Sequence, residues 1–139
     1  MNIDELLKDS KTIDFALDGG KGKKGKVRMQ SPPVQQAREV CEQFFEHGKH
    51  LIAARAATNA GRDYEGEPLP IGMEKCQAAA VRACIAPDDP LASMDEDQSR
   101  AFVRRIGGLE SEVVQYALTV LGISTFDVGD AAEGDHSDF

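Results

Sequence analysis

The sequence lacks the long apolar run that a membrane-spanning helix requires, since 18 apolar residues stand together nowhere along it. Its first residues, MNIDE, also lack the basic start and apolar centre of a signal peptide. It has no excess of positive charge, and its formal net charge of -8 disfavours general binding to nucleic acid or to an anionic membrane. We therefore expect a cytosolic protein without a membrane partner.

No complete catalytic, nucleotide-binding or metal-binding motif occurs either. Cys41, Cys76 and Cys84 lie at apolar helical positions without C-x-x-C spacing, which is typical of buried thiols that pack as small hydrophobic side chains. Residues 20–26 nearly spell a phosphate-binding P-loop, but Val27 replaces the Ser or Thr that binds Mg²⁺, and a strand follows instead of a helix. We therefore predict no catalytic residue, no cofactor and no enzymatic activity.

Two histidines form the nearest approach to a metal site. His47 and His50 are three residues apart beside Glu46, so they share one face of a helix. A zinc site needs a third and fourth ligand at matching spacing, and the sequence provides none. The pair is typical of a solvated surface, and we predict no metal ligand.

The 139 residues suit one domain with a single core. Residues 12–18 and 26–30 alternate between apolar and polar side chains, as half-buried strands do. The segment between them is rich in glycine and lysine and supplies turn chemistry. We therefore predict a β-hairpin over residues 12–30 with a flexible tip.

Helical spacing of apolar residues predicts four helices, at about residues 32–57, 73–85, 94–106 and 110–121. Ser31 followed by Pro32 is expected to start the first, and a capping box of Ser93 and Glu96 the third. A long loop is expected over residues 59–72. The apolar positions assigned to the first helix are Val34, Ala37, Cys41, Phe44, Phe45, Leu51 and Ile52.

The predicted fold class is therefore α+β, mostly α. It comprises an N-terminal β-hairpin and a bundle of about four helices in one domain, residues 1–123, and a disordered acidic tail, residues 124–139. Residues 19–28 carry five cations, Lys21, Lys23, Lys24, Lys26 and Arg28. This basic tip suits nucleic acid phosphates, an acidic protein surface, the acidic tail or simply solvent.

A family resemblance extends over most of residues 10–123. After the hairpin and the long helix come KCQAAAVRACIAPDDPL at residues 75–91, MDED at 94–97, GGL at 107–109 and ALTVLGI at 117–123. This order of a helix, an acidic and proline-containing turn, a second helix and a closing helix with a small aliphatic end resembles the tail assembly chaperones of long-tailed bacteriophages. The family is non-enzymatic.

The resemblance implies a protein that binds the tape-measure protein and tail-tube subunits in the cytoplasm of the infected bacterial host, and that is absent from the mature virion. Candidate apolar contacts are Phe44, Phe45 and Phe126, because neighbouring phenylalanines point about 100° apart on a helix and cannot all fit one small core. Candidate charged contacts are Lys21, Lys23 and Lys24. Self-association stays open. The alternative is a virion structural protein, such as a head-to-tail connector or minor tail protein.

Overall fold

The computed structural model describes residues 10–123. An antiparallel hairpin of β1 (Ser10–Ala16) and β2 (Lys24–Gln30) precedes four helices, α2 (Val34–Asn59), α3 (Leu69–Cys84), α4 (Glu96–Ile106) and α5 (Glu112–Val120). Short 3-10 turns lie at η1 (Asp18–Gly20), η2 (Pro90–Ser93) and η3 (Gly108–Glu110). The predicted α+β, mostly α class is confirmed. The predicted tail, residues 124–139, lies outside the described residues.

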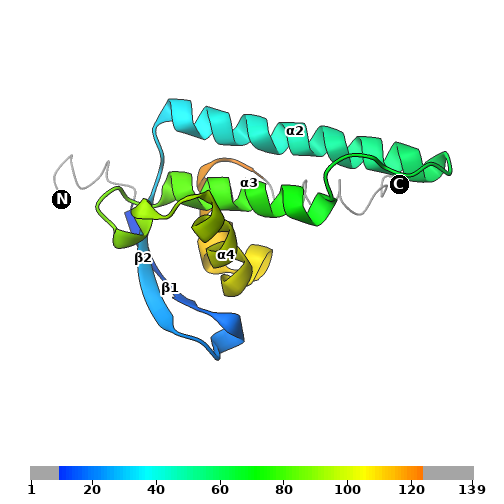
Figure 1. The fold of residues 1–139 in the computed structure, drawn as a ribbon. Helices are drawn as coiled ribbons and strands as arrows, with labels where there is room; N and C mark the ends of the chain where they lie inside the picture. The colour runs from blue at the N-terminus through cyan, green and yellow to red at the C-terminus, as the bar shows by residue number, and fades with distance from the viewer. Residues whose placement is uncertain (1–9, 124–139) are drawn as a thin grey trace, which may run out of the picture.

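Helix α3 is the centre of the fold and packs against α2, α4 and α5. Figure 1 shows α2 along one side of α3, with α4 and the hairpin on the other. The face of α3 that meets these neighbours is built from small side chains, which let helices approach closely. Its buried residues include Cys76, Ala80, Val81 and Cys84.

Prolines explain why two helices begin at other residues than predicted. Helix α2 begins at Val34, after Pro33, and the prediction that Ser31 caps it with Pro32 as its first residue is wrong. The physical reason is that Pro33 disfavours helical backbone at Pro32. Helix α3 begins at Leu69, earlier than predicted, because Pro70 falls in the first turn, where its missing N–H is not needed. The loop after α2 is correspondingly shorter.

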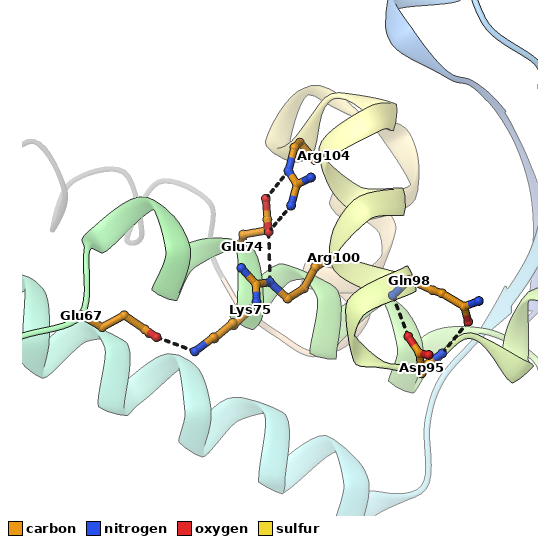
Figure 2. Close-up of polar contacts among 7 residues, drawn as sticks. All are labelled: Glu67, Glu74, Lys75, Asp95, Gln98, Arg100 and Arg104. Carbon is orange, nitrogen blue, oxygen red and sulfur yellow. Dashed lines mark hydrogen bonds and ion pairs between the residues drawn. The ribbon is translucent and has the colours of Figure 1, made fainter.

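Helix α4 begins with a capping box, but not the predicted one. The Gln98 N–H donates to Asp95 Oδ1 at 2.7 Å, and the Asp95 N–H donates to Gln98 Oε1 at 3.0 Å (Figure 2). Ser93, the predicted cap, belongs to η2 and donates its hydroxyl to the Pro90 carbonyl. Ser93 is followed by Glu96 three residues later, and Asp95 is followed by Gln98 in the same way, so the sequence pattern of a capping box fits both positions.

The hairpin packs its inner face against the helices. Ile13, Val27 and Met29 are buried, and the ring of Phe15 meets that of Phe102 on α4 edge-on, with centroids 5.0 Å apart. Phe15 also lies over Gly25, where a Cβ would come within 2.8 Å of the ring. The close fit explains why β2 has glycine opposite Phe15 in the register.

The lysine-rich tip has a defined turn. Its 3-10 turn η1 is held to α4 by Arg105, whose guanidinium donates to Asp18 Oδ2 at 2.7 Å. The Leu17 N–H donates to the Lys23 carbonyl at 3.0 Å and closes the loop. Strand β2 consequently starts at Lys24, before the predicted start, and the tip is shorter than the sequence indicated.

Glu74 joins α3 to α4 through two arginines (Figure 2). Arg104 donates to both of its carboxylate oxygens, at 2.9 and 2.8 Å, and Arg100 donates from Nε at 3.0 Å. The hydrogen bonds from Arg104 and then those from Arg100 hold the pKa of Glu74 below its usual value, against the opposing effect of burial. The network therefore stabilises the fold at neutral pH.

We expect Glu74→Gln to lower the free energy of unfolding by about 1–2 kcal/mol at pH 7, because charge-assisted hydrogen bonds are lost while Arg104 stays accessible to water. Because the folded pKa of Glu74 is depressed, this contribution is lost as the pH falls through that pKa. Urea unfolding at pH 7 and pH 3 measures both effects. Glu42→Gln, an exposed carboxylate of α2, is the control and should change little at either pH. An equal loss at both pH values would contradict this role for the charge.

Candidate partner-binding surface

Helix α2 has two different faces. The buried side chains Val40, His47, Leu51, Ala54 and Ala57 lie on its inner face. The opposite face carries three of the large apolar residues that are exposed: Val34 at 77%, Phe45 at 66% and Ile52 at 69%. Figure 1 shows no helix or strand of residues 10–123 covering this side of α2. We call Val34, Phe45 and Ile52 the outer row.

The outer row is straight. Its members are 11 and 7 residues apart, and at about 100° per residue these spacings place all three within about 20° of one another around the helix axis. With a rise of about 1.5 Å per residue, the row extends over roughly 27 Å. Such a row on a continuous helix presents a preformed line of apolar contacts about five turns long.

Charged and small residues border the outer row. The Nζ of Lys49 lies 5.0 Å from the Phe45 ring centroid, in cation–π range, and also pairs with Glu46 at 3.1 Å. Between Phe45 and Ile52, Gly48 has nothing within 4 Å of where a Cβ would stand. The surface beside Phe45 is therefore open to the approach of another chain.

The structure separates the predicted contact residues. Phe45 is exposed, whereas Phe44 is partly buried and packs against the core, and Phe126 lies outside the described residues. The candidate tip residues Lys21, Lys23 and Lys24 are exposed, but the hairpin tip and α2 lie at opposite sides of the molecule (Figure 1). One small partner segment cannot contact both regions.

Val34, Leu51 and Ile52 were all predicted as apolar positions of this helix, and the structure divides them: Leu51 is buried, whereas Val34 and Ile52 are exposed. The apolar positions 40, 44, 51 and 54, together with His47, follow inner-face spacing, while positions 34, 45 and 52 lie roughly 80–180° away from them around the helix axis. The spacing in the sequence therefore indicates both an inner row and an outer row. It does not indicate which of the two rows packs against α3.

The prediction that His47 is solvated is wrong, because this residue is buried on the inner face of α2. Its ring lies against Gly72 in the first turn of α3, where a Cβ would come within 2.7 Å of Nδ1, and its Nε2 has no hydrogen-bond partner among residues 10–123. Burial lowers the pKa of His47, His50 lowers it further, and Glu67 opposes both. Within residues 10–123, no three His, Cys, Asp or Glu side chains cluster closely enough to hold a metal ion.

His47 predicts a pH dependence of stability. Because its pKa is lower in the folded chain than in the unfolded one, the unfolded state binds more protons, and stability should fall as the pH drops below about 6.5. Urea unfolding at several pH values between 7.5 and 5 measures the slope. His47→Leu should flatten it. His50 lies beside the Tyr64 hydroxyl, with Nδ1 at 3.0 Å from its oxygen, and His50→Gln should leave the pH slope present. An unchanged slope in His47→Leu would place its cause elsewhere.

The comparisons with known proteins leave the function to be argued from the chain itself. No protein-family model, curated protein or solved structure matches it. None of the helices in residues 10–123 has the length and apolar character needed to cross a membrane. The outer row of α2 is the feature of the described residues that most directly offers a binding surface.

Proposed function

We propose that this chain is a tail assembly chaperone of a long-tailed bacteriophage. In this role it binds the tape-measure protein and tail-tube subunits in the cytoplasm of the infected host, has no enzymatic activity and leaves before the virion matures. The observation that carries the proposal is the outer row of α2, with Phe45 exposed at its centre. The resemblance over most of residues 10–123 supplies the identity of the partners.

A holding protein needs an apolar surface that exists before its partner arrives. The outer row meets this need because its side chains project from a 26-residue helix whose other face is fixed on α3. Little conformational entropy is then lost on binding, since the contact line is already formed. Apolar contacts of this kind suit a helical segment lying along α2, with anchors at helical spacing.

The buried thiols support a non-enzymatic role. Burial raises the pKa of Cys76 to about 11 and that of Cys84 to about 12. Because the thiolate is the nucleophilic form, neither cysteine is activated for attack at neutral pH. Their positions in the core account for both residues as packing groups.

Co-expression with the tape-measure protein of the same genome tests the proposal. The wild-type chain should form a soluble complex, and Phe45→Asp or Ile52→Asp should lower its yield at least about tenfold, as expected for central apolar contacts. Lys23→Asp, at a position that is also exposed but lies at the hairpin tip, is the control and should leave the yield unchanged. All three variants should keep the wild-type melting temperature, because the replaced side chains are exposed.

A chain that stays alone in this experiment and is found stoichiometrically in purified virions would contradict the chaperone proposal. That outcome would favour the head-to-tail connector or minor tail protein instead. The exposed tip lysines would then be the first candidates for contact with DNA or a neighbouring subunit.

A further inference from the structure

We propose that the outer row of α2 selects an amphipathic helix whose apolar face is flanked by carboxylates. This inference rests on the proposed function and specifies the chemistry of the partner segment. It is carried by the arrangement of charges around the row and by the open surface at Gly48.

The cations of α2 lie closer to the outer row than its anions do. With Val34 as the reference and about 100° per residue, Arg38, Lys49 and Arg55 fall within about 60° of the row. The three glutamates fall roughly 80–140° away, all on one side; they are Glu39, Glu42 and Glu46. The borders of the row are therefore basic on both sides, although the whole chain carries -8.

Two of these border cations are available to a partner. Arg38 and Arg55 are exposed and form no ion pair with another residue in the described range 10–123. By contrast, Arg104 and Arg105 already form ion pairs within the protein, with Glu74 and Asp18. A helix lying along the outer row with Asp or Glu beside its apolar face would place carboxylates near Arg38 and Arg55.

Gly48 determines how closely such a helix can approach. It lies about 40° from the reference line and between the turns that carry Phe45 and Ile52, with open space where a side chain would stand. A glycine inside an exposed helix lowers helix stability, so a larger residue should be tolerated or stabilising in the free chain. A large side chain here would instead obstruct a partner helix.

Two synthetic peptides test the charge preference directly. Both are amphipathic helices of about 18 residues with the same leucine face, one flanked by glutamate and one by lysine. Fluorescence anisotropy with the full chain should show the glutamate peptide binding at least about tenfold more tightly. The double variant Arg38→Glu with Arg55→Glu should remove or reverse the preference. Arg62→Glu with Arg82→Glu, an equal charge change at exposed positions off the row, should retain it.

Gly48→Leu tests the geometry. It should raise the melting temperature of the free chain slightly and weaken binding of the glutamate peptide at least about tenfold, whereas Gly48→Ala should bind nearly as well as wild type. Unweakened binding by Gly48→Leu would show that the partner does not lie over this part of α2.

Several outcomes overturn the inference. Equal binding of both peptides, tighter binding of the lysine peptide, or no binding of either would do so. A dimer in sedimentation velocity that Phe45→Asp dissociates would show that a second copy covers the row. If the tape-measure complex forms through Phe45 but the peptides show no charge preference, only this inference fails. If the glutamate peptide binds and no tape-measure complex forms, only the proposed function fails.

Discussion

Replacing Cys84 by aspartate is expected to prevent folding. The Cys84 side chain is 0% exposed at the end of α3, and its Sγ faces the Ala117 carbonyl at 3.9 Å. A carboxylate there would lose its hydration and face another oxygen, which costs several kcal/mol for a buried charge without a partner. Circular dichroism and thermal unfolding of the purified variant measure the effect.

Arg82→Asp is the matched control for this substitution, because it places the same carboxylate on an exposed position of the same helix. It should keep the helical spectrum and nearly the wild-type melting temperature. Cys84→Ala separates charge from size and should fold with a smaller loss of stability. Wild-type stability of Cys84→Asp would show that this face of α3 is not in the core.

Phe102→Ala is expected to lower the free energy of unfolding by about 3–5 kcal/mol, the range for removing a buried aromatic ring. Phe102 is almost wholly buried and packs edge-on against Phe15, so its removal leaves a cavity and deprives the hairpin of its main aromatic contact with α4. Urea unfolding of Phe102→Ala, Phe15→Ala and the double variant measures the coupling, expected at about 0.5–1.5 kcal/mol. Phe45→Ala, at an exposed position, should change stability by less than about 0.5 kcal/mol. A coupling near zero would show that the hairpin is held by other contacts.

Local patterns were sufficient to predict the elements of this fold. Alternation in residues 12–18 and 26–30 predicted the hairpin, and its buried Ile13, Val27 and Met29 follow that alternation. Glycines also follow the ends of α4 and α5: Gly107 and Gly122 have φ of 104° and 76°, values that side chains disfavour. These features depend on a few neighbouring residues, which is why the sequence reveals them.

Features that depend on a distant partner could not be predicted in the same way. Which apolar row of α2 is buried depends on the small-residue face of α3, and the burial of His47 depends on Gly72 of that helix. The capping choice between Ser93 and Asp95 depends on how the chain leaves η2. Phe45 could be proposed as a contact from the sequence, because adjacent phenylalanines cannot share one face of a helix. The exposure of Val34 and Ile52 could not be predicted without knowing how α2 packs on α3.

Mapping of backbone amide shifts in the chain, free and bound to the tape-measure protein, tests the central claim most directly. The claim is that the outer row of α2 is the binding surface. We expect the largest changes around Val34, Phe45 and Ile52, with little change at the hairpin tip, residues 19–25. Changes concentrated at the tip, with α2 unaffected, would contradict it.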